Sequence, residues 1–584
     1  YSEADKYIDE EKGVPDRQSA INGAKDIIAE IISDNAELRK KLRELFENHG
    51  ELQSRMINDD GKGTYAMYAD YSELVPEIKN HRVLAVNRGE KEGCLKVKLY
   101  FNPDMAKRVC AAKYVHTKGA CADLIREAAD DGYDRLIEPS VEREVRAMLT
   151  ERAGEQAIKM FEVNLRPLLL QPPVKGKVAL GLDPGYRMGC KVAVVDETGK
   201  VLETSVIYPV PPFHREEEAK KTVKGLIYKY GVDMIAIGNG TASKETEIFV
   251  ADLLKEVERD VSYMVVNEAG ASVYSASKLA AEEFPDYDLN VRSAISIARR
   301  LQDPLAELIK IDPKSIGVGQ YQHDVDQKRL DSALGGVVED CVNSVGVDLN
   351  TASASLLEHV AGLNAGIAKN IVAYRESNGK FTGRAQLLGV KRLGEKAYEQ
   401  CAGFLRIPGG DNIFDNTAVH PESYEKAKKL LNLFGYTEDD VKGGGLAELS
   451  QKVKAFGEKK AAEYVGLDVP TLRDIITELM RPGRDIRDSL PAPKLRKDIM
   501  GIEDLQVGMV VDGTVRNVID FGAFIDIGVH QDGLVHISEI TDRYIKHPSD
   551  VLKVGQQVKA VVISVDVKKH RIGLSLKQLK KATN

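Results

Sequence analysis

The sequence predicts a multidomain protein that is mainly α-helical, with one α/β domain and a C-terminal β-barrel. Its 584 residues exceed what a single hydrophobic core organises, so several domains are expected. Residues 177–330 alternate strand and helix patterns, which is typical of a sheet covered by helices. Residues 505–577 contain five short β-rich runs of the length found in small barrels.

Composition restricts the classes of function. The apolar fraction of 43% and the charged fraction of 29% are those of a soluble globular protein. The formal net charge of −8 leaves nucleic-acid binding to local patches. The six cysteines form no Cys-x-x-Cys pair, which argues against a zinc site and a disulfide framework and favours a reducing, cytoplasmic compartment. No apolar run suggests a membrane span, so no membrane partner is expected.

The N-terminal part of the chain has helical patterns on both sides of a β-rich insert. Residues 1–60 and 104–170 have helical apolar spacing, and a strand-like run lies within the insert near 62–102. A short linker, Gln171-Pro172-Pro173, ends this region. The chain begins at Tyr1 without a methionine, directly in helix-like sequence, so we expect an N-terminal portion to be missing.

The α/β domain opens with a buried strand that ends in an acid. Val178, Leu180 and Leu182 alternate with small residues up to Asp183, and two hairpin strands follow. The RNase H-like fold begins in this way, and the segment resembles the YqgF-type branch of that fold. The resemblance implies that the acid holds a divalent metal against a phosphodiester. The local alternative is that Asp183 caps the Asp-Pro-Gly turn.

Few other acids could complete such a metal site. A nuclease needs several carboxylates to hold divalent ions, and Gly238-Asn239 stands where resolvases of that fold carry a glutamate. Glu268, after the next strand, and Asp303, in a later helix, remain as candidates, because the carboxyl ends of parallel strands share one crevice. The incomplete set predicts a retained fold without catalytic residues, metal or cofactor. The alternative is a magnesium-dependent, structure-specific nuclease that uses Asp183, Glu268 and Asp303.

Two short turns between helices resemble the helix-hairpin-helix motif. The first lies in residues 360–368 and the second in residues 388–394, which pairs Gly362 with Gly389. In such a motif, backbone N–H groups at the start of the next helix can bind a phosphate. The alternative is a plain αα-hairpin with glycine caps. The residues that we expect at nucleic acid are Gly362, Gly366, Lys369, Gly389, Lys391, Arg392 and Gly394.

A proline linker, Leu490-Pro491-Ala492-Pro493, precedes the C-terminal domain. The runs FGAFIDI and GLVHIS resemble the RNA-binding domain named for ribosomal protein S1, which is an OB-fold barrel. The resemblance implies that two aromatic rings and a histidine imidazole stack on bases, and that an arginine contacts phosphate or stacks as well. The pattern carries over to Phe521, Phe524, His536, Asp566 and Arg571.

The alternative places Phe521 and Phe524 in the barrel core. The two rings are three positions apart on a twisted strand, so alternation alone does not assign both, and a core role for one of them stays open. Residues 501–584 hold 11 Lys and Arg against 10 Asp and Glu, which predicts modest affinity from this domain alone.

A longer resemblance covers the whole chain. The stretches 299–325, 238–243, 81–92 and 415–422 closely resemble the Tex family of bacterial transcription accessory proteins, and the eukaryotic elongation factor Spt-six shares that architecture. The resemblance implies a non-enzymatic transcription factor that binds RNA, DNA or both without strong sequence preference. A scaffold that docks on RNA polymerase or the ribosome is a further alternative.

We therefore divide the chain into six segments. They are an N-terminal helical region with its β-rich insert (1–176), a YqgF or RNase H-like domain (177–330), a tandem helix-hairpin-helix (331–410), a second helical domain (411–489), a linker (490–504) and an S1-type OB-fold (505–577).

Overall fold

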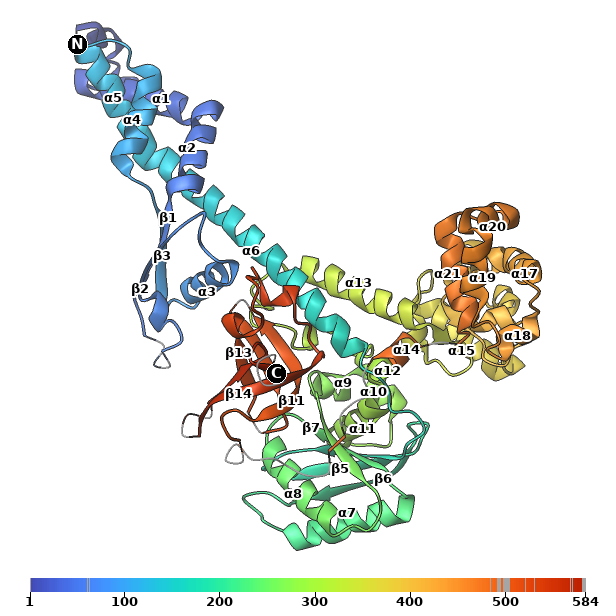
Figure 1. Ribbon diagram of the computed structural model, residues 1–584. Coiled ribbons are helices and arrows are strands. Elements are labelled where there is room, and N and C mark those ends of the chain that lie inside the picture. The colour runs from blue at the N-terminus through green and yellow to red at the C-terminus, as the bar shows by residue number, and fades with distance from the viewer. Residues whose placement is uncertain are drawn as a thin grey trace. The chain divides into compact units, whose positions relative to one another are not determined.

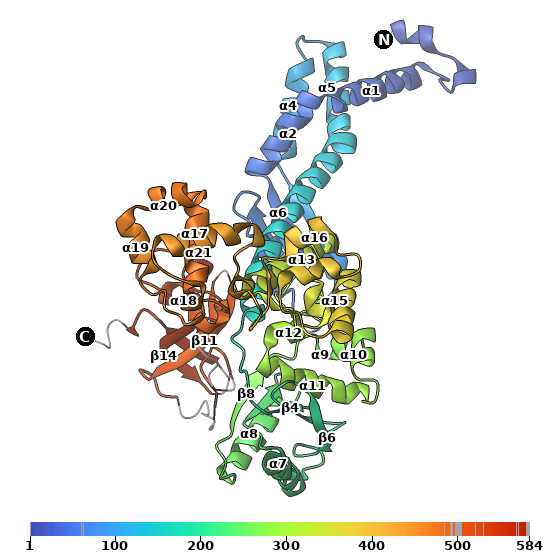
Figure 2. The same cartoon turned by 90° about the vertical axis from the view of Figure 1, so that its right-hand side faces the viewer.

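The computed structural model describes residues 2–579, except 60, 62, 484, 491–494, 497–504, 520, 530, 568 and 570. The chain divides into two compact units, which Figures 1 and 2 show from two directions. The first unit joins Tyr1–Phe161 to Gly319–Leu330, and the second joins Glu162–Val318 to Asp331–Asn584. Within the described ranges, no helix is long and apolar enough to cross a membrane.

The first unit combines helices with a three-stranded antiparallel sheet. The sheet has the order β2-β1-β3, and the local sequence predicts helix where β1 lies. The helical pattern ends at His49 because the following strand pairs with two strands from later in the chain, which local spacing does not reveal. The elements are α1 (Arg17–Ser33), α2 (Ala36–His49), β1 (Glu51–Met56), β2 (Asp70–Leu74), α3 (Asn80–Lys91), β3 (Leu95–Tyr100), α4 (Pro103–Tyr114), α5 (Ala120–Gly132) and the start of α6 (Glu138–Leu169).

Arg88 of α3 holds the segment Gly319–Leu330 within this unit. Its guanidinium donates to the carboxylate of Asp324 and lies 4.6 Å from the centre of the Tyr321 ring. The stretches 81–92 and 299–325, both of which resemble the Tex family, therefore meet in the folded chain.

The second unit contains a five-stranded mixed sheet. Its order is β6-β5-β4-β7-β8, with β4, β7 and β8 parallel and the hairpin strands β5 and β6 antiparallel to their neighbours. This is the topology expected from an opening hairpin followed by right-handed crossovers. The strands are β4 (Ala179–Asp183), β5 (Cys190–Val195), β6 (Val201–Ile207), β7 (Met234–Gly238) and β8 (Ser262–Val266).

Helices cover both faces of this sheet. Leu180 and Leu182 pack in one apolar cluster with residues of α7 (Glu216–Tyr230) and α8 (Ser243–Lys255). Ala179, from the opposite side of the same strand, packs with residues of α11 (Leu289–Gln302). The period of two along β4 thus separates two cores, as expected for a strand buried on both faces. Three short helices complete the domain: α9 (Ala271–Ser275), α10 (Lys278–Glu283) and α12 (Pro304–Leu308).

Two helical modules follow, and a buried arginine joins them. Arg384 is 1% exposed and donates to the carbonyls of Leu405, Thr417 and Val419 and to the hydroxyl of Tyr424. A buried guanidinium needs such complete pairing, so the two modules share one polar centre. Their elements are α13 (Gln327–Val345), β9 (Val347–Asp348), α14 (Ala354–Leu357), α15 (Ala365–Asn378), α16 (Glu395–Cys401), β10 (Leu405–Arg406), α17 (Tyr424–Leu433), α18 (Glu438–Lys442), α19 (Leu449–Phe456), α20 (Glu458–Val465) and α21 (Val469–Met480).

The C-terminal domain is a closed five-stranded barrel. The strands follow the order β11-β12-β13-β15-β14 around the barrel, with β13 and β15 parallel and the other pairs antiparallel. Closure leaves no free sheet edge, which suits so small a domain. The strands are β11 (Val510–Ile519), β12 (Gly522–Asp526), β13 (Gly533–His536), β14 (Gln557–Asp566) and β15 (Arg571–Ser575). The linker residues Pro491, Ala492 and Pro493 lie outside the described residues.

Candidate nucleic-acid interface

The rings expected to stack bases lie on the outside of the barrel. Phe521 is 52% exposed and directly precedes β12, and Phe524 is half-buried on that strand. The neighbours Ala523 and Ile525 are fully buried in the barrel core. Because successive strand residues face opposite sides, Phe524 faces away from that core. The alternative of a core role for one of the phenylalanines is therefore wrong.

Phe524 and His536 belong to one outer surface. Phe524 pairs with Leu534 across β12 and β13, and Gly522 pairs with His536. The Phe521 carbonyl accepts a hydrogen bond from the backbone N–H after His536, at 2.9 Å. His536 is exposed, and its Nδ1 lies 2.9 Å from the hydroxyl of Ser538, a contact that fixes the plane of the imidazole.

Arg571 lies at the other end of this surface. Leu534 pairs with Gly573 in the parallel strands β13 and β15, so Arg571 is four residues from the position opposite His536. At about 3.3 Å per residue, this offset is about 13 Å. Asp566 pairs with Arg571 in the register of β14 and β15, and its carboxylate accepts from the N–H of Lys569 in the turn between them.

The first helix-hairpin-helix turn has a left-handed residue at its glycine. Gly362 has a φ of 81°, and the N–H of Leu363 donates to the carbonyl of Val360 at 3.0 Å. A Cβ at Gly362 would press against the side chain of Gln400. Both the backbone angle and the close packing therefore require glycine here.

The helix that follows this turn already has a cap. The side chain of Asn364 accepts from the N–H of Ile367 at 3.0 Å, so one of the backbone donors at the start of α15 is satisfied internally. Gly366 and Lys369 are exposed on the first turns of that helix.

The second turn repeats the same geometry at an arginine. Arg392 has a φ of 69°, and the N–H of Leu393 donates to the carbonyl three residues back at 3.1 Å. Arg392 is therefore the structural equivalent of Gly362. The pairing of Gly362 with Gly389 is wrong, because Gly389 ends the short helix that precedes the turn.

The second turn presents an uncapped helix start. Gly394 precedes α16 and has no side chain to bond the first N–H groups. Lys391, Arg392 and Gly394 are exposed, and the carbonyl of Lys391 accepts from the side chain of Asn370 on α15 at 2.7 Å. That bond connects the two hairpins.

Two of the three candidate metal-binding acids come together in the α/β domain. Asp183 ends β4, and Glu268 follows β8. Burial raises the pKa of Asp183, against a hydrogen bond from Ser293 and the charge of Lys191. Burial also raises the pKa of Glu268, and the charge of Asp183 raises it further. Each carboxyl therefore lies where its ionised form is disfavoured.

Glu268 fills the place of the missing strand-borne acid. A Cβ on Gly238 or Gly240 would overlap its carboxylate oxygens. The side chain of Asn239 accepts from the Glu268 N–H at 3.0 Å and so anchors the backbone of the acid. The Oε2 atom of Glu268 is buried and has no hydrogen-bond partner among the described residues. The glycines in Gly238-Asn239-Gly240 thus admit a carboxylate that arrives from the next strand.

Asp303 lies away from this pair. Ser293, which contacts Asp183, and Asp303 are separated along α11 by ten residues, or about 15 Å at 1.5 Å per residue. Asp303 caps α12 and accepts from the guanidinium of Arg487 at 2.7 Å. In the described part of the chain, no group of three or more His, Cys, Asp or Glu could hold a metal ion. The described structure therefore brings Asp183 and Glu268 together and places Asp303 elsewhere.

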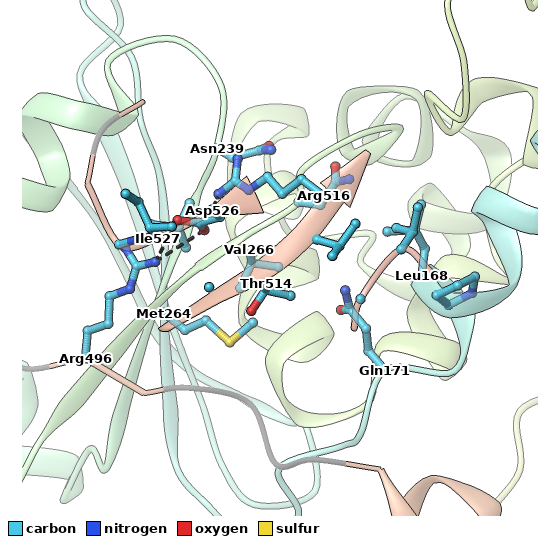
Figure 3. Close-up of a pocket in the computed structure, with 18 of the residues that line it drawn as sticks. Leu168, Gln171, Asn239, Met264, Val266, Arg496, Thr514, Arg516, Asp526 and Ile527 are labelled. Carbon is cyan, nitrogen blue, oxygen red and sulfur yellow. Dashed lines mark hydrogen bonds and ion pairs between the residues drawn. The ribbon is translucent and has the colours of Figure 1, made fainter. Parts of the chain in front are cut away.

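A cavity of about 550 Å³ lies where the barrel meets the α/β domain (Figure 3). Met264 and Val266 of β8 line one side, and Thr514 and Arg516 of β11 line the other. The linker residue Arg496 pairs its backbone with Tyr263 at the edge of β8. Its guanidinium bonds both Glu247 of α8 and Asp526 of β12, each at 3.2 Å. The barrel is therefore tied to the α/β domain beside the linker.

Five segments of the chain match protein families. Residues 1–161 match the Tex central region-like family, residues 177–302 the Tex protein YqgF-like domain, residues 342–406 the helix-hairpin-helix motif, residues 412–487 an HHH domain and residues 504–577 the S1 RNA binding domain. Over 98% of its length the chain is 46% identical to the transcriptional accessory protein Tex of Neisseria gonorrhoeae, of which it covers 75%.

The chain belongs to the Tex family. It is also 52% identical to the uncharacterized protein YdcI of Bacillus subtilis, covering 98% of this chain and 80% of that one. Identity to protein YhgF of Escherichia coli is 44%, over 98% of this chain and 75% of that protein. The predicted Tex resemblance and the predicted fold class are confirmed.

The comparisons and the structure together add three features that were not predicted. Residues 412–487 match an HHH domain, and the apolar-Gly-apolar run Val465-Gly466-Leu467 within them is a sequence signal that could have revealed it. Lys191, paired with Asp183 across β5 and β4, is a buried cation beside the acid. Ser293 faces Asp183 from α11. Ser293 and Asp183 are far apart in sequence, so spacing gives no signal for that contact, whereas Lys191 lies across the local hairpin of β4 and β5 from Asp183.

Proposed function

We propose that this transcription accessory protein binds RNA or single-stranded nucleic acid without strong sequence preference, chiefly through its S1 domain. The observation that carries the proposal is the outward position of Phe521, Phe524 and His536 on a barrel whose core other residues fill. Aromatic faces stack on any base, and so give affinity without selecting a sequence. Arg571, about 13 Å along the surface, adds a cation for the phosphate backbone.

The helix-hairpin-helix module adds backbone contacts. Lys391 and Arg392 are exposed at a turn whose next helix starts without a side-chain cap. Cations and free N–H groups at a helix start suit phosphate oxygens and carry no sequence information. The first turn contributes Lys369, but Asn364 already bonds one donor of its helix. The second turn is therefore the stronger phosphate contact of the two.

The RNase H-like domain acts in this proposal as a scaffold without metal or cofactor. A buried lysine opposite Asp183 and a third acid about 15 Å along α11 support this role, because a divalent-ion site needs several converging carboxylates. The physiological partners are RNA, DNA or both. Docking on RNA polymerase or the ribosome is compatible with this role. A role in transcription and cysteines without disulfide partners both favour a cytoplasmic location for the protein.

Removal of residues 490–584 tests where the affinity resides. Two stacked bases at about 1 kcal/mol each correspond to about 30-fold, so single-strand affinity should fall at least that much. Fluorescence anisotropy with a labelled oligonucleotide measures the loss, and circular dichroism must show that the remaining domains stay folded. Unchanged affinity in the folded truncation would move the function to the hairpin module.

A cleavage assay tests the scaffold role separately. We expect no cleavage of single-stranded, duplex or branched substrates with magnesium or manganese. Cleavage that disappears in Asp183→Asn, while the variant keeps its oligonucleotide affinity, would establish the nuclease alternative instead.

A further inference from the structure

A buried arginine of the α/β domain is only partly hydrogen-bonded. Arg300, on α11, is 2% exposed. Its Nη1 donates to the carbonyls of Asn267 and Ala269, at 2.7 and 2.9 Å. Its Nε and Nη2 are buried and have no hydrogen-bond partner among the described residues. A buried guanidinium normally has all its donors paired, as Arg384 does in the helical modules.

No direct ion pair neutralises the charge of Arg300 within the described part of the chain. The nearby Glu307 is bonded instead to Lys310 and to Ser296. Burial lowers the pKa of Arg300 to about 10, against the charges of Glu307 and Glu268. An anionic acceptor in contact with the guanidinium would therefore stabilise it.

The two unpartnered nitrogens form the edge of the guanidinium that suits a carboxylate. Nε and Nη2 carry parallel N–H bonds, which match the two oxygens of a carboxylate. Arg17 uses this edge to donate to both oxygens of Asp5. Arg329 donates to Glu155 in the same way. A carboxylate is therefore the acceptor that fits the unpartnered edge of Arg300.

A small pocket adjoins this arginine. Its volume is about 20 Å³, and a buried water needs roughly 10–15 Å³, so the pocket has room for one or two water-sized groups. That suits the two oxygens of a carboxylate, whereas the tetrahedral oxygens of a phosphate need more space. Besides Arg300, Gln171 and Asn267, the described lining is apolar and suits a carbon stem: Leu168, Val266, Ala269, Pro304, Leu308 and Ile316.

The cavity of about 550 Å³ beside the barrel is a neighbour of this pocket. Four residues line both, and Figure 3 labels the first three: Leu168, Gln171, Val266 and Asn267. The cavity lies at the carboxyl end of β8, which is where open α/β sheets bind ligands. Its volume is typical of a small-molecule site. The rest of a ligand whose carboxylate reaches Arg300 therefore has room nearby.

We propose that Arg300 binds the carboxylate of a small organic acid, with Nε and Nη2 donating to its two oxygens and the rest of the acid extending toward the larger cavity. The side-chain amide of Gln171, which bonds no other described residue, is a second donor at the pocket. This site is separate from the nucleic-acid interface proposed on the barrel and the hairpin module, so the two proposals fail independently.

The test measures uptake of labelled acetate by the full chain in equilibrium dialysis, at constant ionic strength in sodium chloride. Acetate carries the carboxylate on a single methyl group. We expect saturable uptake at a single site. Inorganic phosphate should compete about tenfold less well than unlabelled acetate, because it exceeds the volume of the pocket.

Two variants test the arginine and the pocket separately. Arg300→Lys keeps the charge but loses the paired donors, so affinity for acetate should fall about tenfold or more. Ala269→Val narrows the pocket beside an unchanged guanidinium and should lower affinity by about the same factor. The matched control is Arg299→Lys, at a residue that bonds Gly199 and Glu283 outside the pocket, and it should alter affinity less than about twofold.

Circular dichroism decides which variants are compared, because Arg300 is buried. If Arg300→Lys does not fold, Ala269→Val tests the pocket, and the competition experiment needs no variant. The proposal is overturned if the wild type shows no saturable uptake, or if phosphate displaces acetate as well as acetate itself does. Unchanged affinity in a folded Arg300→Lys or Ala269→Val variant would also overturn it. Each of these results would mean that the pocket holds water or an adventitious ion only.

Discussion

The barrel and the α/β domain place their function-bearing side chains in opposite environments. On the barrel, Phe521 and His536 are exposed while their small and aliphatic neighbours fill the core. In the α/β domain, Asp183 and Glu268 are turned into the fold, and glycines make room for the second carboxylate. One domain thus turns its candidate side chains outward, and the other buries them.

This difference bears on how far a fold determines its chemistry. The strand order and the position of the first acid of the α/β domain follow the RNase H-like pattern. The crevice itself holds a carboxylate from another strand, a buried lysine and a serine. Fold alone therefore predicts little of the chemistry here, and the environment of each side chain decides it.

Salt dependence should give the largest effect that separates stacking from phosphate contact. With about four phosphates contacted, log K against log salt should slope by roughly −3 on single strands, or about 50-fold between 50 and 200 mM. Replacing Lys391 or Arg392 by alanine should make the slope shallower by about 0.7 each, because fewer counterions are released. Anisotropy titrations over that salt range measure the slope.

The proposed division between stacking and phosphate contact fails if removing Lys391 or Arg392 leaves the slope of log K against log salt unchanged. Phe524→Ala is the matched control, because loss of a stacked base releases no counterions and should leave the slope unchanged. A flat salt response of the wild type, or a strong preference for one sequence over its scramble, would contradict binding through backbone contacts.

Single substitutions on the barrel should give a smaller effect. Phe524→Ala and His536→Ala should each weaken single-strand binding about five-fold or more, since each stacked base is worth about 1–3 kcal/mol. Tyr464→Ala, at an exposed aromatic residue of α20, is the control outside the barrel and should have no effect. Near-ultraviolet and far-ultraviolet circular dichroism must show an intact barrel, because only folded variants with unchanged affinity would argue against this surface.

The barrel was largely predictable from sequence because its signals are local. Strand patterns and the family-like runs predict five short strands in residues 505–577, and the barrel strands β11 to β15 lie there. The orientation of Phe521 and Phe524 was not predictable. Alternation assigns a face only to residues within one regular strand, and Phe521 lies just before β12 begins.

The candidate site in the α/β domain was only half predictable. Asp183 and Glu268 do share the crevice, as the parallel strands predict. Asp303 does not, because its side chain caps the helix that begins at Pro304. In the two hairpins, the sequence suggests that Gly362 and Gly389 occupy equivalent positions. The positive backbone angle φ is instead found at Gly362 and Arg392, which are therefore the equivalent residues. Sequence spacing identifies candidate residues, but it does not show which of their side chains occupy the site.

The smallest effect that we expect is a pH-dependent gain in stability when the buried acid pair loses a charge. Burial and the charge of Asp183 hold the pKa of Glu268 above its ordinary value of 4.5 in the folded chain. The folded state therefore binds this proton more tightly than the unfolded state. Stability falls as pH rises from the ordinary pKa through the raised one, and the full cost remains above it.

Glu268→Gln removes that titration and keeps the shape of the side chain. Its melting temperature should exceed that of the wild type at pH 8 and match it near pH 3, where both carboxyl groups are protonated. In a domain of this size each kcal/mol corresponds to about 2–4 °C, so differential scanning calorimetry resolves the expected gain. The control is Glu197→Gln, at an exposed acid of the same domain, whose melting temperature should follow the wild type at both pH values. An equal or lower melting temperature of Glu268→Gln at pH 8 would mean that the ionised carboxylate is satisfied where it lies, which would restore it as a candidate ligand for a cation.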